Sequence, residues 1–232
     1  MELPGLKQTD HQLRLFENCR VIRSKGECRW MVGEFFEECT AKLSGGVRMK
    51  TSGAVKYCPD VRFSQHQFFE VKGVGRNGGM ILYDCRIEKD LCFLEKIREG
   101  NSDAGLWYWV WRHESSVLDF TGSPVTELWR GLVDGLRSVA IVPVERLWGI
   151  VEHRPVRVMN SGITKAGKRC GYGAKSYGKG WSVRYSELVV GLKSLKVRFV
   201  TNGIRVNVDV WLTLEMRQFI QVSQDRQLEL FQ

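Results

Sequence analysis

The chain has 232 residues, of which 43% are hydrophobic, so it is too apolar for a disordered protein and long enough for one large domain or a core with a smaller appended region. Lysine and arginine outnumber aspartate and glutamate by 35 to 26, and the resulting net charge of +9 favours a polyanionic partner such as DNA or RNA. No apolar run reaches transmembrane length, and Met1-Glu2-Leu3-Pro4 lacks the features of a signal peptide, so we expect a cytoplasmic protein with no membrane partner.

The seven cysteines are odd in number and include no Cys-x-x-Cys pair. A zinc ribbon needs such pairs, and a disulfide framework normally uses an even number of cysteines. We therefore expect neither, and predict reduced thiols that are buried in a cytoplasmic protein.

The first predicted element is a helix from Ser24 to about Leu43, which Gly45-Gly46 would end. Its apolar side chains recur at every fourth position, at Met31, Phe35, Cys39 and Leu43. Four acids lie on this helix, namely Glu27, Glu34, Glu37 and Glu38. Ser24-x-x-Glu27 is also the pattern of a capping box, in which serine and glutamate satisfy backbone amides at the start of a helix. A purely structural role for Glu27 therefore stays open.

Short strands are predicted next at 47–50 and 54–57, followed by a hairpin of 61–63 and 68–72. Asp60 opens this hairpin, and Glu70 and Lys72 lie two residues apart on its second strand, so they share one face. The hairpin would bring Asp60 beside Glu70 and Lys72. Two carboxylates in a small volume repel each other unless a cation lies between them, and their hard oxygen atoms favour magnesium or manganese over zinc.

A glycine-rich bend follows at 73–79, where Gly73-Val74-Gly75-Arg76-Asn77-Gly78 matches the glycine spacing of dinucleotide-binding loops. Such a loop must follow an apolar parallel strand inside a strand-helix-strand unit. Here the preceding strand carries Glu70 and Lys72 and is the second strand of a hairpin. We therefore expect no nicotinamide cofactor, and interpret the bend as a flexible loop in which Arg76 contacts a phosphate.

The middle of the chain is predicted to alternate helices and strands. Met80 to Ile97 favours a helix with a basic side that includes Arg86. Leu106 to Trp111 is aromatic throughout, which is typical of a strand buried on both faces. The remaining elements expected here are a helix at 124–137, a strand at 139–142 and a helical turn at 144–150.

From His153 through Ser186 the sequence has no carboxylate, and its cations are interspersed with glycines and aromatics. Glycine lets a backbone approach phosphates, cations displace counterions, and aromatic rings stack on exposed bases. We expect a DNA-contacting loop that orders on binding, although a solvated basic loop has the same composition. The cations that we assign to DNA binding in this stretch are Lys165, Lys168, Arg169, Lys175 and Lys179.

After this stretch, a helix is expected at 186–195 and a hairpin at 196–212 that turns at Asn202-Gly203. The expected organisation is an N-terminal segment (1–23), an α/β core (24–143), a smaller basic α+β region with the hairpin (144–222) and a tail (223–232).

The tail ends in Gln227-Leu228-Glu229-Leu230-Phe231-Gln232. It resembles the short peptide, commonly Gln-Leu-(Ser/Asp)-Leu-Phe, by which bacterial polymerases and repair proteins hold the sliding clamp. The resemblance implies that Leu228, Leu230 and Phe231 anchor in an apolar pocket while Gln227 makes polar contacts. A terminus folded back onto the core is the structural alternative. Gln12-Leu13-Arg14-Leu15-Phe16 has the same spacing, and whether it also binds a clamp stays open.

Pro59, Asp60, Glu70 and Lys72 together resemble the motif of the PD-(D/E)xK nuclease superfamily, over a stretch from about Ser24 to His113. The resemblance implies a restriction-endonuclease-like core in the order helix, three strands, helix, strand. It further implies a Mg²⁺ site, which Mn²⁺ could also occupy, formed by Asp60, Glu70 and the Val71 carbonyl, with Lys72 as a catalytic cation. Glu27 is added to the catalytic set because Ser24-x-x-Glu27 looks like the helix opening of resolvase-like members.

We therefore expect a magnesium-dependent DNA endonuclease from a bacterium or a phage-infected cell. The tail favours a structure-selective enzyme of recombination, repair or replication that is similar to a Holliday-junction resolvase and is tethered to the clamp. Resolvase-like action would normally imply a homodimer. A site-specific restriction or transposon endonuclease is the nearest alternative. A non-catalytic DNA-binding adaptor on the clamp is the alternative from another class.

Overall fold

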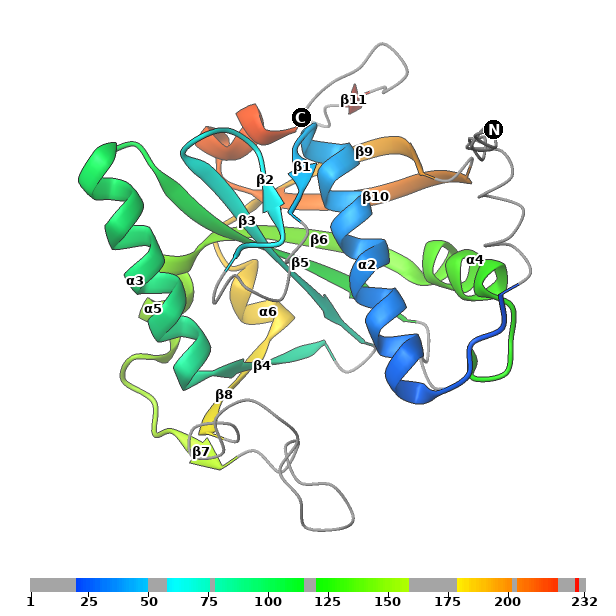
Figure 1. Ribbon diagram of the computed structural model, residues 1–232. Coiled ribbons are helices and arrows are strands. Elements are labelled where there is room, and N and C mark those ends of the chain that lie inside the picture. Colours follow the sequence, from blue (N-terminus) through cyan, green and yellow to red (C-terminus); the bar gives the residue numbers. More distant parts are fainter. Residues whose placement is uncertain are drawn as a thin grey trace, which may run out of the picture.

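The computed structural model describes residues 20–49, 58–75, 78–114, 120–158, 179–201, 204–220 and 228–229. Within these ranges the fold is mixed α/β, as predicted, with helices packed on a curled mixed sheet (Figure 1). The main sheet has the strand order β1-β2-β3-β5-β6-β10-β9-β11, and a second sheet has the order β4-β8-β7. Among the described helices, none has both the length and the apolar character needed to cross a bilayer.

The predicted first helix is confirmed as α2 (Lys25–Ser44). It begins after Ser24, whose hydroxyl accepts a hydrogen bond from the backbone N–H of Glu27 at 3.1 Å. It ends where Gly45 adopts a φ of 77°, a left-handed conformation that favours glycine.

The hairpin that carries the acidic residues is also confirmed. It consists of β2 (Val61–Arg62) and β3 (Gln67–Val74), which pair antiparallel with Val61 opposite Phe69. The preceding strand β1 (Val47–Arg48) is shorter than expected and pairs with β2. The expected strand at 54–57 lies outside the described residues.

The segment after β3 corrects one prediction, because the helix expected from Met80 does not begin there. Residues Gly79–Tyr83 instead form β4, and α3 spans Asp84–Gly100. β4 pairs antiparallel with β8 (Lys179–Arg184), a partner far away in the sequence that local periodicity does not reveal. The chain then enters β5 (Gly105–His113), which is parallel to β3, so α3 forms the crossover between them.

Three further elements agree with the expected types: α4 (Val125–Gly135), β6 (Leu136–Pro143) and α5 (Val144–Val151). β6 pairs antiparallel with β5 on one side and parallel with β10 on the other. The sheet therefore continues without a break from the predicted core into the C-terminal part of the chain.

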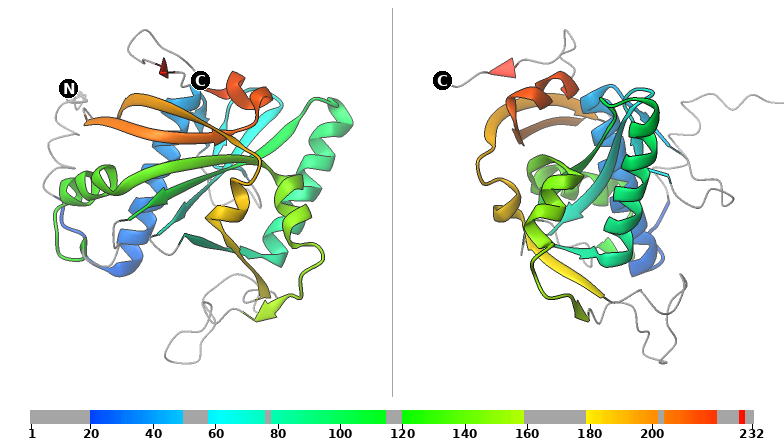
Figure 2. Two further views of the ribbon diagram at one scale, coloured as in Figure 1. Left: turned by 180° about the vertical axis from the view of Figure 1, so that it is seen from behind. Right: turned by 90° about the vertical axis from the view of Figure 1, so that its left-hand side faces the viewer.

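The C-terminal elements include the predicted hairpin, now β9 (Lys193–Thr201) and β10 (Ile204–Leu212). The helix expected at 186–195 is wrong in extent, because α6 covers only Tyr185–Leu188 and Gly191 then takes a φ of 72°. The remaining short elements are β7 (Arg157–Val158), the 3-10 helix η3 (Leu214–Phe219) and β11 (Leu228–Glu229). Both strands of the hairpin lie toward the opposite end of the sheet from α3 (Figure 2).

Two apolar cores cover the two faces of the main sheet. One contains α2 and α4, and the other contains α3, α5, α6 and part of the second sheet. β5 contributes to both, because Trp109 and Trp111 enter the first core whereas Tyr108 and Val110 enter the second. This confirms the predicted strand that is buried on both faces.

The expectation of buried thiols holds only in part. None of the five described cysteines forms a disulfide, and Cys28 and Cys39 are buried, but Cys92 on the outer side of α3 is exposed.

Candidate active site at the edge of β3

The backbone of β3 leaves one edge open where the acidic residues lie. β2 pairs only with Phe68 and Phe69, and the chain before it passes through Asp60, whose N–H donates to the carbonyl of Phe69 at 3.0 Å. The next backbone group on that edge is the N–H of Val71, which donates to Oδ2 of Asp60 at 2.7 Å. A strand residue turns its N–H and its carbonyl to the same edge, so the carbonyl of Val71 also lies on the side of Asp60.

Glu70 is deeply buried, with a relative exposure of 1%. One of its carboxylate oxygens pairs with the ammonium group of Lys72, and the other pairs with the guanidinium group of Arg86 from α3. A buried carboxylate needs such partners because its desolvation is costly. The structure thus brings Glu70 and Lys72 together as predicted, and adds Arg86.

Arg86 is itself held by the buried side chain of Asp90, which Tyr108 holds in turn. Nε of Arg86 lies 3.3 Å from Oδ1 of Asp90, one turn further along α3. The other oxygen of Asp90 accepts a hydrogen bond from the hydroxyl of Tyr108, the residue on β5 directly opposite Glu70. Asp90 and Tyr108 are both fully buried. Burial and then the charge of Asp90 raise the pKa of Tyr108 well above its ordinary value, so the hydroxyl remains a donor.

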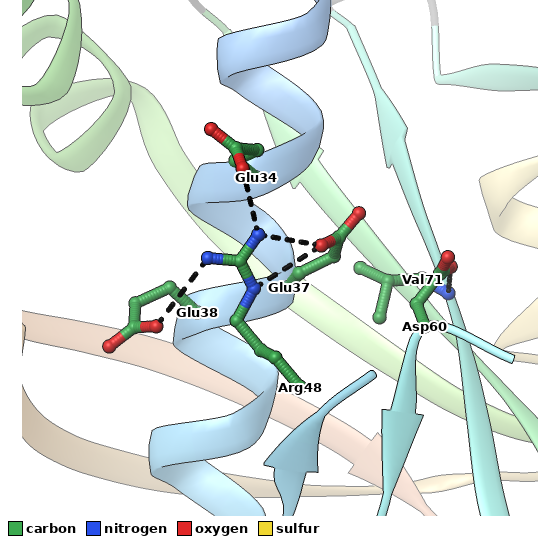
Figure 3. A network of polar contacts seen from close by, with 6 residues as sticks. All are labelled: Glu34, Glu37, Glu38, Arg48, Asp60 and Val71. Carbon is green, nitrogen blue, oxygen red and sulfur yellow. Dashed lines mark hydrogen bonds and ion pairs between the residues drawn. The ribbon is translucent and has the colours of Figure 1, made fainter. Parts of the chain in front are cut away.

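A second cluster of charges approaches the site from α2 (Figure 3). Arg48 of β1 contacts three acids of that helix: Glu37 at 2.9 Å, Glu34 at 3.2 Å and Glu38 at 3.8 Å. Glu37 points from the helix toward Asp60 (Figure 3). Burial raises the pKa of Glu37, Arg48 opposes this effect, and the charges of Glu34 and Glu70 add to it. Glu37 is therefore the acid of the first helix that is electrostatically coupled to the site.

The two predicted metal-binding acids are strongly coupled. Burial first, and then the negative charge of Glu70, raise the pKa of Asp60 from 3.8 to about 7, although Lys72 and the N–H of Val71 act in the opposite direction. For Lys72, burial lowers the pKa, but the charges of Glu70 and Asp60 outweigh burial and raise it. Lys72 therefore stays protonated at neutral pH. Crowded negative charge around Asp60 is the condition that a bound cation would relieve.

The oxygen atoms at this site are of the kind that bind a hard cation, but they are few. In the described part of the chain, no cluster of three or more histidine, cysteine, aspartate or glutamate side chains is arranged to hold a metal ion. Asp60 and Glu70 provide carboxylate oxygens, and Val71 provides a carbonyl oxygen. A carboxylate offers about four lone-pair positions, so the contacts of Glu70 with Lys72 and Arg86 leave room for a further partner. Oxygen donors of this kind fit magnesium, which usually keeps several waters.

Glu27 lies apart from this cluster. Its side chain accepts the backbone N–H of Arg23 at 2.7 Å and pairs with Arg20, and its own N–H donates to Ser24. Ser24 thus caps the helix as half of a capping box, whereas the side chain of Glu27 binds the N–H of the residue before the cap. The bond from Arg23 and then the side chain of Arg20 lower the pKa of Glu27. Ten residues separate Glu27 from Glu37, which is about 15 Å along a helix that rises 1.5 Å per residue.

Other predicted residues fall partly outside the described chain. Arg76 and four cations of the basic stretch, namely Lys165, Lys168, Arg169 and Lys175, are outside it, as are Gln227, Leu230 and Phe231 of the tail. Lys179 begins β8 and is exposed. Leu228 belongs to β11, where it pairs with Val197 of β9.

The sequence did not point to Asp90 or Tyr108, it offered Glu37 only as one of four candidate acids on the first helix, and it placed Arg86 only on the basic side of a helix. The spacing of four residues between Arg86 and Asp90 is the signal that was present, because residues at this spacing are neighbours on a helix. Nothing local indicates that Tyr108 lies beside Glu70, because that requires the pairing of β3 with β5.

Comparison with known protein families, curated proteins and solved structures finds no match to this chain.

Proposed function

We propose that the chain is a magnesium-dependent DNA endonuclease that hydrolyses phosphodiester bonds at the open edge of β3. The observation that carries this proposal is the convergence of Asp60, Glu70 and Lys72 at one place, with the pKa of Asp60 raised to about 7. Strongly shifted acids beside a cation are typical of functional sites. The net charge of +9 is consistent with a nucleic-acid substrate.

In this proposal Asp60, Glu70 and the carbonyl of Val71 hold the ion, for which manganese can substitute. When bound, the ion supplies charge neutralisation for the phosphodiester and a lower pKa for an attacking water. Lys72 is the catalytic cation. Because its pKa is raised, it acts as a charged donor that stabilises negative charge on the phosphate and orients the water, and not as a base.

We propose two further roles within the site. Arg86 keeps the carboxylate of Glu70 in place, and Asp90 with Tyr108 keeps Arg86 in place. Arg86 is thus a positioning residue. Glu37 takes the place of Glu27 as the acid of the first helix that influences Asp60, because its charge raises the pKa of Asp60 whereas the contacts of Glu27 lie at the start of the helix.

We also propose that the core is restriction-endonuclease-like. The supporting observation is the order α2, β1, β2, β3, α3, β5, with the antiparallel β2–β3 pair and the parallel β3–β5 pair. β4, which lies between β3 and α3, departs from this order and belongs to the second sheet.

We propose that the enzyme acts on branched DNA during recombination, repair or replication, and that the tail with Gln227, Leu228, Leu230 and Phe231 holds the sliding clamp. A clamp tether would deliver the enzyme to replicated DNA without a target sequence. A resolvase-like enzyme would act as a dimer. Removal of Leu230 and Phe231 should abolish binding to a purified bacterial clamp while cleavage of free DNA stays unchanged, and retained clamp binding would contradict the assignment of the tail.

One observation favours a non-catalytic DNA-binding adaptor instead. The charge of Glu70 is compensated by Lys72 and Arg86 within the protein, as in a purely structural ion-pair network. The two alternatives differ in metal binding. Calorimetric titration with manganese should detect binding to the wild-type chain and much weaker binding to Asp60→Asn if the endonuclease proposal is correct, and no binding to either if the site is structural.

Cleavage is tested on branched, flapped and linear DNA with magnesium. Asp60→Asn and Lys72→Ala should each lower the cleavage rate by about a hundredfold or more, the loss typical of removing one charge-stabilising group from an active site. Matched controls are Glu88→Gln and Lys89→Ala on the exposed side of α3, which change charge equally. Equal rates in all variants would remove Asp60 and Lys72 from the mechanism, and the substrate preference would decide between a structure-selective and a site-specific enzyme.

A further inference from the structure

The hairpin β9–β10 presents a polar face that is separate from the candidate active site. Along β9 the buried Leu195, Val197 and Phe199 alternate with exposed residues, and β10 alternates in the same way. The exposed positions of this hairpin include Lys196, Arg198 and Arg205. With Arg137 from the neighbouring strand β6, these residues form what we call the β9–β10 basic face.

The basic face is hollowed. A depression of about 350 Å³ is lined by Arg137, Lys196 and Arg198, together with Asn207, Asp209 and the strand residues Val197 and Val208. Cations outnumber acids in this lining by three to one. Arg205 lies on β10 diagonally from Arg198, since Arg198 pairs with Asn207 and Arg205 pairs with Val200. Such diagonal neighbours are about 7–8 Å apart.

Two arginines of this face, Arg198 and Arg205, are available for a ligand, whereas Arg137 already has a carboxylate and two backbone carbonyls as acceptors. Nε of Arg198 donates to Oδ1 of Asn207 at 2.9 Å, which fixes the orientation of the guanidinium group. Among the described residues, no carboxylate forms an ion pair with Arg198 or Arg205. Arg137 pairs with Glu114 at 2.8 Å, but both side chains are nearly half exposed, and exposed pairs of this kind are weak. A phosphate could therefore replace Glu114.

The strand register places this face relative to the candidate site. Tyr108 lies opposite Glu70 on one side and Val142 on the other, so all three side chains are on the same face of the sheet. Side chains alternate along β6, which places Ser138 on that face too. Asp209 lies opposite Ser138 and Lys196 lies opposite Asp209, so both are on the same face as Glu70. The helices α3, α5 and α6 pack on that side of the sheet over β3, β5 and β6. The basic face is thus a second surface, on the same side of the sheet and beyond these helices.

We propose that the β9–β10 basic face binds the phosphate backbone of nucleic acid, independently of whether the chain cleaves it. Charge complementarity supports this partner, because guanidinium groups form bidentate contacts with phosphate. The one aromatic residue on this side of β10 is Trp211, which packs against the second core, so the face offers little for base stacking. Binding is therefore through the backbone and without sequence preference.

The test measures binding of a labelled DNA duplex by fluorescence anisotropy over a series of salt concentrations, with a chelator present so that no cleavage occurs. The variant is Arg198→Gln with Arg205→Gln. The matched control is Lys25→Gln with Arg29→Gln, which removes the same charge from exposed positions on α2, the helix on the opposite side of the sheet. Circular dichroism and thermal melting establish that all variants are folded.

The face variant should bind more weakly, and the slope of log affinity against log salt should fall by about two, because each phosphate contact contributes about 0.9. The control should keep the wild-type slope. Arg198→Lys with Arg205→Lys should bind with nearly the wild-type slope, since a point charge still displaces a counterion. Equal losses in the face variant and the control, or no loss in either, would overturn the assignment. So would a retained slope in a folded face variant, whatever the cleavage assay shows.

Discussion

Asp60 and Val71 are joined by a hydrogen bond in which the backbone N–H of Val71 donates to the carboxylate of Asp60 at 2.7 Å. This bond takes the place of a strand pairing, because β2 pairs with β3 only as far as Phe69. It therefore fixes a carboxylate at an edge where a backbone carbonyl also lies. The same position costs Asp60 its hydration and brings it near Glu70, and this combination explains its raised pKa.

The raised pKa of Asp60 predicts that folding stability falls as pH rises. The pKa is 3.8 ordinarily and about 7 in the folded chain, so the folded state binds the proton more tightly. The stabilisation is complete below pH 3.8 and is lost as pH approaches 7. The variant Asp60→Asn cannot ionise at this position. Its free energy of unfolding, relative to that of the wild type, should therefore be higher at pH 8 than at pH 4 by roughly 1–3 kcal/mol, a range that allows for the partial exposure of Asp60. Urea denaturation without metal measures this difference.

A bound metal ion should reverse the difference in stability between the wild type and Asp60→Asn at pH 8. If Asp60 helps to hold a cation, magnesium at pH 8 should stabilise the wild type and have little effect on Asp60→Asn, because a ligand that binds only the folded state raises stability. Identical pH dependence of stability in the two metal-free proteins would contradict the raised pKa of Asp60.

Local signals in the sequence were sufficient for the elements around the site. The capping serine, the fourfold spacing of apolar residues and Gly45 predicted α2, and the two-residue spacing of Glu70 and Lys72 predicted their shared face. These features depend on neighbours within one or two turns. The signal for the hairpin β9–β10 was equally local, since Asn-Gly, here Asn202-Gly203, is characteristic of tight hairpin turns.

The parts that could not be predicted depend on long-range pairing. Met80 to Tyr83 became a strand because β8, about a hundred residues later, offers it a partner, and no local pattern contains that information. Arg86 reaches Glu70 only because α3 crosses from β3 to β5 over the sheet. The prediction of Glu27 rested on a pattern that the start of a helix also satisfies, and no local pattern shows that Glu37 is the acid of α2 whose charge acts on Asp60.

The network behind Arg86 predicts a coupled loss of stability. Tyr108→Phe removes the hydroxyl that donates to the buried Asp90, and a buried carboxylate that loses a donor costs about 1–3 kcal/mol of unfolding free energy. Asp90→Asn should also destabilise the chain, because Arg86 loses its ion pair. In a double-mutant cycle the two losses should be non-additive by about 0.5 kcal/mol or more, as expected for residues in one network. Additive losses measured by denaturation would show that the two side chains do not act together.

The close packing of α2 on β3 predicts a cost for enlarging Gly73. A Cβ atom at this position would lie 2.5 Å from the ring of Phe36, too close for any side chain to occupy. Gly73→Ala should therefore lower the unfolding free energy by about 1–3 kcal/mol, the range found for overpacked cores. Gly75→Ala is a matched control two residues away, because no described atom lies within 4 Å of its Cβ position. Phe36→Leu in the Gly73→Ala background should recover part of the loss, whereas equal stabilities of the two alanine variants would contradict the packing shown.

The acids of α2 give the sharpest separation of structural and functional roles. Glu27→Ala removes the contacts with Arg23 and Arg20 at the start of α2 and should lower the free energy of unfolding slightly, while the proposed cleavage by the folded protein stays unchanged. Glu37→Gln removes a charge that raises the pKa of Asp60. The acidic limb of the pH–rate profile should then move to lower pH, because Asp60 ionises more readily once that repulsion is gone. The measurement is the pH–rate profile of each variant, taken below its melting temperature. If the acidic limb shifts in Glu27→Ala and does not shift in Glu37→Gln, then Glu27 and not Glu37 is the acid of α2 that belongs to the site.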